Sequence, residues 1–199
     1  MAERTGLADF NEVYNSVIKN FEWGYVNDPD DPGGETIDGI SRRAHPDWNV
    51  WEMIDRLKKE GSDVELKIRS IPNFEEVKKN LYQEKYWKEI YGSLLTKAVG
   101  KELFEQSIHM GVVTAVKYFQ SSINLLNRNQ KLYPDIIEDG VMGDKTYEAY
   151  KSCLGYNSEN ILLNLMNGHQ ISHYINWMKN TKQREKFIGV FGRVTIKWA

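Results

Sequence analysis

The acids between residues 21 and 41 are the part of the sequence best suited to chemistry. They share this short segment with two prolines and a Gly-Gly pair. The six carboxylates are Glu22, Asp28, Asp30, Asp31, Glu35 and Asp38. Cleavage of a glycosidic bond needs one protonated acid and one ionised carboxylate, placed on opposite sides of that bond. The segment is therefore a candidate for acid–base chemistry on a sugar.

Glu22 is the candidate for the protonated acid. It lies between Phe21 and Trp23, and we expect it in the last turn of a helix. Aromatic neighbours remove water from a carboxyl group, and the dipole at a helix C-terminus disfavours its anion, so both effects raise its pKa. A raised pKa suits a general acid near neutral pH. From the residues alone, an exposed glutamate at a helix end is the other interpretation.

Asp31 is the candidate for the ionised partner. It follows Glu22 across a turn rich in Pro and Gly at residues 29–34. If this turn folds back, a carboxyl separation of about 6.5–9.5 Å would leave room for a water and invert the sugar carbon. Asp28 and Asp30 compete for the same role. An acid that only bonds its own turn is the alternative.

Thr36 could hold the attacking water by its hydroxyl, or it could be an ordinary strand threonine. The acids at residues 28–31 offer oxygen ligands to Ca²⁺, but they lack the twelve-residue spacing of an EF-hand loop. His169 and His173 have a spacing compatible with a metal on a helix, yet no HExxH motif surrounds them. We therefore expect no metal and no cofactor.

Apolar periodicity predicts the elements that position these residues. Helices are expected over residues 9–23, 49–60, 73–91 and 144–154, with one or two long helices over 93–109 and 111–127 and two more after Ser158 and Thr181. Pro and Gly exclude a helix over residues 25–40. There, residues 25–26 and 36–40 are expected to form a short hairpin or three-stranded flap. The predicted fold is mainly α with a small β-hairpin.

Composition limits the classes of partner. The chain has 199 residues and a net charge of −2, and its mean hydropathy is −0.58. This balance gives no pull toward nucleic acid, and no apolar run reaches the roughly 18 residues of a membrane span. Cys153 is the single cysteine, so no intrachain disulfide can form. We expect a monomer that does not insert into membranes.

The run EWGYVNDPDDPGGET from Glu22 to Thr36, followed by GIS at residues 39–41, resembles the signature of the family 108 glycoside hydrolases. That signature is roughly E-G-G-Y-x-N-D-P-x-D-x-G-G-x-T-x-x-G-I. These are phage and bacterial N-acetylmuramidases, some of them labelled secretion activator proteins. The resemblance implies a lysozyme-like helical fold with a β-hairpin in the N-terminal lobe. It implies Glu22 as the catalytic acid and, by similarity to phage-type lysozymes, Asp31 and Thr36 as its partners.

The resemblance also places Tyr25, Asp28 and Trp23 at the substrate. The segment DGVMGDKT from Asp139 to Thr146 is similar to the D-G-x-x-G-x-x-T motif of a peptidoglycan-binding segment, although such a turn can also merely join two helices. These similarities imply a lysozyme-like catalytic domain over residues 1–110 and a helical peptidoglycan-binding segment over 111–199, packed on the same core.

The implied activity is hydrolysis of the β-1,4 bond between N-acetylmuramic acid and N-acetylglucosamine in peptidoglycan. A lytic transglycosylase and a non-catalytic wall-binding or secretion-associated protein remain alternatives. Trp23 replaces a glycine of the family pattern, Asp38 replaces an aromatic, and His109 falls where an asparagine is usual. The first residues show no signal peptide, so we expect synthesis in the cytoplasm and action in the periplasm or outside, with a holin as one route.

Overall fold

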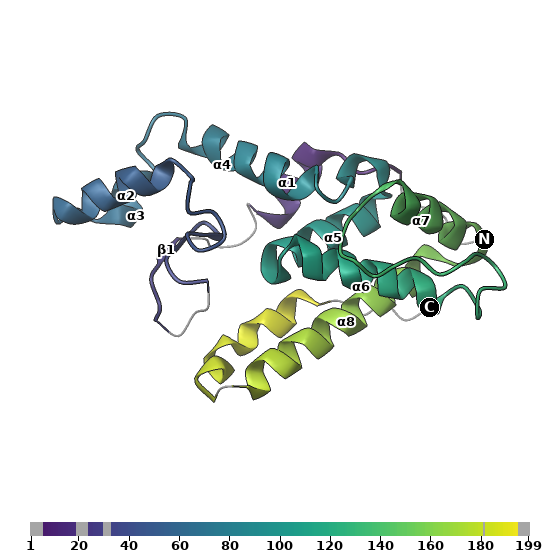
Figure 1. Ribbon diagram of the computed structural model, residues 1–199. Helices are drawn as coiled ribbons and strands as arrows, with labels where there is room; N and C mark the ends of the chain where they lie inside the picture. The colour runs from purple at the N-terminus through teal and green to yellow at the C-terminus, as the bar shows by residue number, and fades with distance from the viewer. Residues whose placement is uncertain (1–5, 19–23, 30–32, 181, 195–199) are drawn as a thin grey trace. The chain divides into compact units, whose positions relative to one another are not determined.

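The computed structural model describes residues 6–18, 24–29, 33–180 and 182–194. Helices make up most of this part of the chain, together with three short strands (Figure 1). The predicted mainly α fold with a small sheet is confirmed, and it is consistent with a lysozyme-like fold. Contacts divide the chain into a smaller unit, Lys19–Leu81, and a larger unit, Met1–Ile18 with Tyr82–Ala199. The predicted division near residue 110 stays a prediction.

The smaller unit contains the sheet. Its strands β1 (Tyr25–Val26), β2 (Thr36–Ile37) and β3 (Ile40–Ser41) are antiparallel in the order β1-β2-β3. Asp38 and Gly39 connect β2 to β3 with φ angles of 46° and 80°. Two positive φ angles are what a tight two-residue hairpin turn requires, and Asp-Gly is a favoured pair there. The predicted three-stranded flap is confirmed.

Helices α2 (Val50–Lys59) and α3 (Val64–Ile68) follow, and α4 (Phe74–Tyr82) begins in this unit. Its core consists of apolar side chains that are at most 2% exposed: Ile37, Ile40, Trp51, Ile54 and Ile68. Trp51 also donates its indole N–H to the carbonyl of His45 (2.7 Å). The sheet is therefore seated on a buried apolar layer although each strand is only two residues long.

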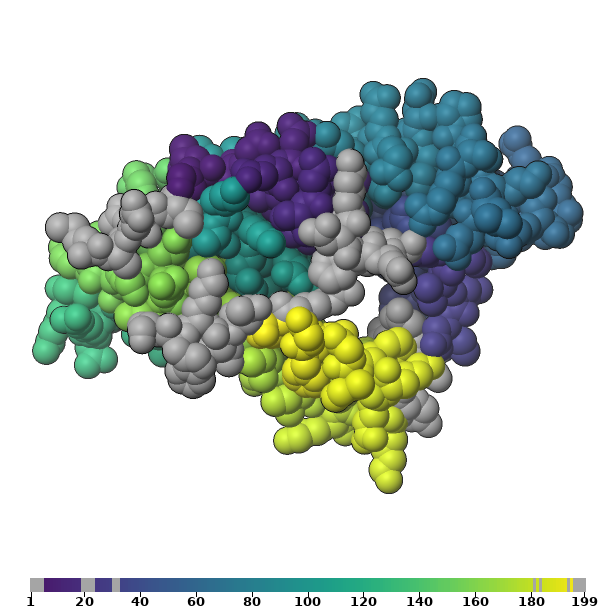
Figure 2. All heavy atoms as spheres, turned by 180° about the vertical axis from the view of Figure 1, so that it is seen from behind, coloured from purple at the N-terminus to yellow at the C-terminus, as the bar shows by residue number. Residues whose placement is uncertain are grey.

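The larger unit is helical. Its elements are α1 (Phe10–Val17), a π-helix η1 (Gln83–Trp87), a 3₁₀ turn η2 (Gly92–Leu94), α5 (Lys97–Met110), α6 (Val112–Leu125), α7 (Asp144–Tyr156), α8 (Glu159–Lys179) and a 3₁₀ segment η3 (Lys182–Arg193). Helix α8 packs against α5 and α6, and η3 lies alongside α8 (Figure 2). Phe104 and Phe119 are fully buried at this centre.

The helix boundaries differ from the prediction in several places. Helix α1, capped by Asp9, ends at Val17, and the rest of the predicted helix to Trp23 lies outside the described residues. The predicted helix over 73–91 is interrupted, because Lys88 N–H donates to the Gln83 carbonyl (3.0 Å), five residues back. The short helix α3 was not predicted.

Within the described residues, no helix is both long enough and apolar enough to cross a membrane. Cys153 is buried in α7, and burial raises the pKa of its thiol. A buried thiol with a raised pKa is a weak nucleophile, as expected from the sequence.

Candidate active-site hairpin

A cluster of four charged side chains and one tyrosine organises the hairpin: Tyr25, Glu35, Arg42, Asp55 and Lys58. Glu35, just before β2, is at its centre. One carboxylate oxygen accepts hydrogen bonds from the Tyr25 hydroxyl (2.6 Å) and from Lys58 Nζ (2.7 Å). The other accepts from Arg42 Nη1 (2.7 Å). This Glu35 cluster ties β1 to β2 and fastens both to α2.

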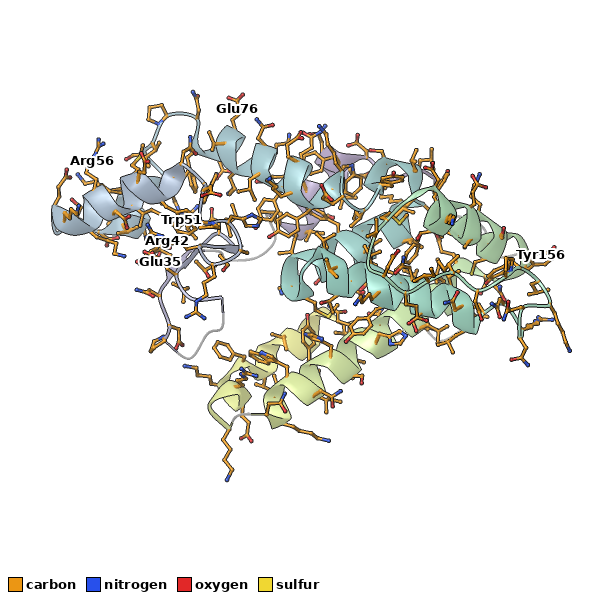
Figure 3. All side chains as sticks on the ribbon, viewed as in Figure 1. Glu35, Arg42, Trp51, Arg56, Glu76 and Tyr156 are labelled. Carbon is orange, nitrogen blue, oxygen red and sulfur yellow. The ribbon has the colours of Figure 1, made fainter. Side chains whose placement is uncertain are left out.

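Arg42 connects the cluster to α2 in two further ways. Its guanidinium makes a bidentate pair with Asp55, with N–O distances of 2.7 and 2.6 Å. It also lies over the Trp51 ring, 5.3 Å from the ring centre. Figure 3 shows Glu35, Arg42 and Trp51 close together. Such two-pronged contacts fix both the position and the orientation of a guanidinium.

The contacts of Glu35 keep it ionised. Burial opposes the charge, but hydrogen bonds from Lys58, Tyr25 and Arg42 outweigh it and lower the pKa of Glu35 below its usual 4.5. Burial and the neighbouring Glu35 charge raise the pKa of Tyr25. The hydrogen bond to Glu35 raises the pKa of Lys58. Tyr25 is therefore neutral, Glu35 anionic and Lys58 cationic near neutral pH.

From the sequence, Glu35 had no role of its own among the six acids, whereas its side chain is 10% exposed and bound by three partners. The signal that could have indicated its role is strand alternation, which places residue 35, just before β2, on the same face as the buried Ile37 and on the opposite face to Thr36. Its cationic partners come from residues 42 and 58, too distant in sequence for local patterns to reveal.

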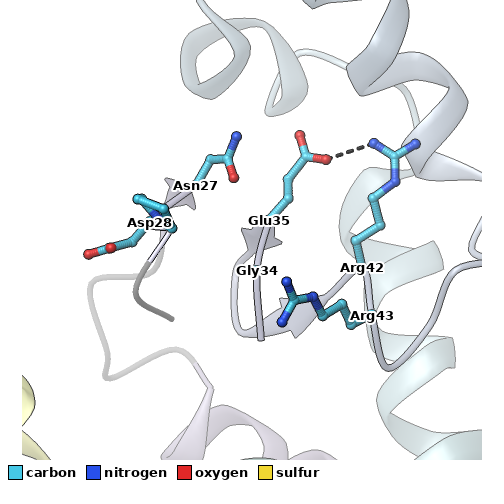
Figure 4. Close-up of a pocket in the computed structure, with 7 residues that line it drawn as sticks. Asn27, Asp28, Gly34, Glu35, Arg42 and Arg43 are labelled. Atoms are coloured by element: carbon cyan, nitrogen blue, oxygen red, sulfur yellow. Dashed lines mark hydrogen bonds and ion pairs between the residues drawn. The ribbon is translucent and has the colours of Figure 1, made fainter. Parts of the chain in front are cut away.

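A hollow of about 290 Å³ opens beside this cluster. We call it the hairpin hollow; its walls include Asn27, Asp28, Gly34, Glu35, Arg42 and Arg43 (Figure 4). Gly34 has a φ of 66°, and a Cβ there would lie 3.3 Å from Arg43 Nε. Glycine thus lets the Arg43 side chain approach the backbone closely. The walls offer carboxylates, guanidinium groups and an amide to a polar ligand.

Thr36 is the first residue of β2. Its hydroxyl donates to the Gly34 carbonyl (3.0 Å). A threonine oxygen that donates its own hydrogen keeps lone pairs that can accept one from water. The geometry of Thr36 is thus compatible with the water-holding role expected of it, and equally with a hydroxyl that stiffens the turn.

The sequence-based site residues divide into two groups. Tyr25, Asp28 and Thr36 are described, and all three belong to the hairpin. Glu22, Trp23 and Asp31, and with them Asp30, lie outside the described residues. The roles expected of all of these residues stay predictions. Asn27, Glu35, Arg42 and Arg43, which line the hairpin hollow, were not identified from the sequence.

The contacts of Asp38 explain what a carboxylate does at this position. Its side chain is 2% exposed and pairs with Lys78 Nζ (2.8 Å) and Arg69 Nη2 (3.2 Å). Lys78 is itself only 6% exposed and also pairs with Glu75 (2.8 Å). The carboxylate that replaces a usual aromatic thus anchors the β2–β3 turn to the C-terminal end of α3 and to α4.

In the larger unit, Gln120 of α6 holds the DGVMGDKT turn. Its Nε2 donates to Asp139 Oδ1 (2.9 Å) and to the Thr146 hydroxyl (3.0 Å), while its Oε1 accepts from Gly140 N–H (2.9 Å). The hydrogen bonds from Gln120 and from the Val141 amide lower the pKa of Asp139. The motif therefore fastens the loop between α6 and α7 to α6.

The two histidines of α8 contact an aromatic side chain. His169 stacks on Tyr118 with ring centres 5.0 Å apart, and His173 Nδ1 lies 3.2 Å from the Tyr118 hydroxyl. Burial lowers the pKa of both rings. In the part of the chain that the structure describes, no three His, Cys, Asp or Glu side chains converge as metal ligands would.

Comparisons with known proteins match two regions of the chain to two protein families. The family described as glycosyl hydrolase 108 matches residues 15–111, and the one described as predicted peptidoglycan domain matches residues 114–192. A solved structure, SagA from Brucella abortus, superposes with a TM-score of 0.61 at 24% identity. That alignment covers 93% of this chain and 88% of SagA, and at this identity it shows a shared fold.

A comparison with curated proteins finds no match. The two family matches join a glycosidase domain to a peptidoglycan domain and so support a glycosidase that acts on the cell wall, with peptidoglycan as its partner. The chain therefore carries a glycosyl hydrolase 108 domain followed by a peptidoglycan domain.

Proposed function

We propose that this protein is an N-acetylmuramidase that hydrolyses the β-1,4 bond between N-acetylmuramic acid and N-acetylglucosamine in peptidoglycan. The observation that carries the proposal is the glycosyl hydrolase 108 match, which spans the whole run from Glu22 to Thr36. The peptidoglycan domain that follows it supports the choice of polymer.

In this proposal Glu22 protonates the glycosidic oxygen as the bond breaks. Asp31 activates or positions the water, or stabilises the positive charge that develops on the sugar ring. Thr36 accepts a hydrogen bond from that water, since its own hydrogen is donated to the Gly34 carbonyl. The oxygen of the water then has a lone pair directed away from Thr36, toward the sugar carbon.

The described contacts refine the substrate-binding roles. The Tyr25 hydroxyl already donates to Glu35, so Tyr25 contributes its ring face to the sugar. Asp28 lines the hairpin hollow and accepts hydrogen bonds from sugar hydroxyls. Trp23 supplies a second aromatic surface. Apart from the Tyr25 ring, the Glu35 cluster touches no substrate in this account and instead holds the hairpin in register.

The site of action is the cell wall, in the periplasm or outside the cell. A holin pore supplies a route across the membrane for an enzyme of this kind. The proposal therefore expects lysis only when the protein is given access to the wall, for instance by a membrane-permeabilising agent.

Turbidity clearing of purified cell walls tests the assignment. Glu22→Gln keeps the size of the side chain but removes the proton donor, and loss of a general acid lowers rates by about 10²–10⁴-fold. Glu52→Gln, on the exposed face of α2, is the matched control and should clear walls like the wild type. Equal clearing by the wild type and Glu22→Gln would overturn the assignment of Glu22.

A further inference from the structure

A second hollow, of about 380 Å³, lies in the larger unit beside the C-terminal half of α6. We call it the loop hollow; its walls include Ser121, Asn124, Asn129, Gln130, Asp135 and Glu138. Its volume falls in the range of small-ligand sites, about 300–1,000 Å³. It belongs to the segment matched by the peptidoglycan domain.

The walls of the loop hollow are fixed by hydrogen bonds from asparagine side chains to the backbone and to another side chain. Asn124 Nδ2 donates to the Ile136 carbonyl, and Asn124 Oδ1 accepts from Ile136 N–H, both at 2.9 Å. The buried Asn127 donates to Asp135 Oδ1 (2.5 Å) and accepts from Gln130 N–H (3.0 Å). The returning loop is thus held against α6 without a ligand, and preformed walls reduce the ordering cost of binding.

The turn that begins this loop has an unusual backbone. Arg128, Asn129 and Gln130 have consecutive φ angles of 55°, 57° and 62°. Left-handed conformations are uncommon for residues other than glycine, and a run of three persists only where the surroundings hold it. The bond from Leu132 N–H to the Asn127 carbonyl (3.1 Å) closes this turn. As a result, the polar side chains of Asn129 and Gln130 lie at the hollow.

The chemistry of the walls favours a cationic hydrogen-bond donor. Asp135 and Glu138 are carboxylates, and the described lining residues include neither Lys nor Arg. Each carboxylate has about four acceptor positions, and the bonds from Asn127 and Asn124 use one on each. The described lining also lacks an aromatic ring, the surface on which sugar faces commonly stack.

We propose that the loop hollow binds the free amino group of the diamino acid in a peptidoglycan stem peptide. This inference rests on the proposed function in taking peptidoglycan as the partner. The ammonium would donate to Asp135 and Glu138, and the amides of the peptide would meet Asn129, Gln130 and Ser121. The loop hollow would thereby hold the polymer by its peptide, and the hairpin would act on its glycan strand.

Calorimetric titration of the full chain with the tripeptide amide N-acetyl-L-Ala–γ-D-Glu–L-Lys-NH₂, in which the lysine amine is the only free amine, tests this. Acetylation of the lysine amine should weaken binding at least about tenfold, because it removes charge-assisted hydrogen bonds. The double variant Asp135→Asn/Glu138→Gln should lose as much affinity for the free amine. Glu148→Gln, which removes an exposed acid of α7, is the matched control and should bind like the wild type.

An unchanged affinity after acetylation, an unchanged affinity in the double variant, or no binding by the wild type would overturn the inference. Circular dichroism checks that the double variant is folded; both substitutions keep the oxygens that accept from Asn127 and Asn124. Wall clearing is measured separately. Clearing without peptide binding refutes the inference alone, whereas peptide binding without clearing refutes the proposed hydrolase and supports the inference.

Discussion

Asp38→Asn is the sharpest test of how the hairpin is held. The substitution removes the buried negative charge that pairs with Lys78 and Arg69. It does not strain the backbone, because Asp38 has a φ of 46° and asparagine tolerates this left-handed conformation. Any loss of stability therefore reports the ion pairs rather than strain in the turn.

The expected cost follows from burial. Asp38 is 2% and Lys78 6% exposed, and removing one partner of a buried pair costs about 3–5 kcal/mol. Lys78 retains Glu75, whose side chain is 62% exposed, and the new amide still offers an oxygen. We therefore expect the lower end, about 3 kcal/mol. At about 2–4 °C per kcal/mol for a chain of this length, Tm should fall by about 6–12 °C.

Urea and thermal unfolding, followed by circular dichroism, measure this loss. Asp55→Asn is the matched control, because its partner Arg42 is 33% exposed and Asp55 41% exposed. A pair as exposed as this contributes about 1 kcal/mol or less and weakens in salt. The reasoning is refuted if Asp38→Asn costs no more than Asp55→Asn, or if 1 M salt abolishes its effect.

Three further predictions concern the fold. The lowered pKa of Glu35 stabilises the fold above about pH 4.5, and this stability is lost as the pH falls through the lowered value. The difference in the urea midpoint of unfolding between the wild type and Glu35→Gln should therefore become smaller from pH 7 to pH 3. A difference that stays constant over this range would contradict the prediction. Gly140→Ala should lower the free energy of unfolding by about 1–3 kcal/mol, because the φ of Gly140 is 82° and an added Cβ would lie 2.7 Å from the Val113 carbonyl oxygen. Gly155→Ala, inside α7, should instead raise it by about 0.5–1 kcal/mol. Gln120→Ala should cost about 2–3 kcal/mol in the same assay, and a change under 0.5 kcal/mol would show that the DGVMGDKT turn holds itself.

Local patterns in the sequence were enough to predict most helices and the flap. Helices α1 and α2 have strong apolar faces, and the Asp-Gly pair at residues 38–39 is a favoured hairpin turn. Helix α3 was missed because five residues carry too little periodicity. Its one signal is Asp63, whose side chain accepts from Leu66 N–H (3.1 Å) and caps the helix.

The candidate site was only partly predictable. No local pattern distinguished Glu35 from the other acids of the segment, since its partners Arg42 and Lys58 lie in a turn and on α2. From the sequence, Asp38 was a departure from the family pattern, while its contacts show that it anchors a turn. In both cases the contacts between elements distant in sequence decide what a carboxylate does.

The most direct test of the central claim is mass spectrometry of the fragments that the protein releases from purified peptidoglycan. Hydrolysis by a muramidase predicts fragments with reducing N-acetylmuramic acid ends, released by the wild type and Glu52→Gln but not by Glu22→Gln. Fragments ending in 1,6-anhydro sugars, or identical fragments from the wild type and Glu22→Gln, would contradict it.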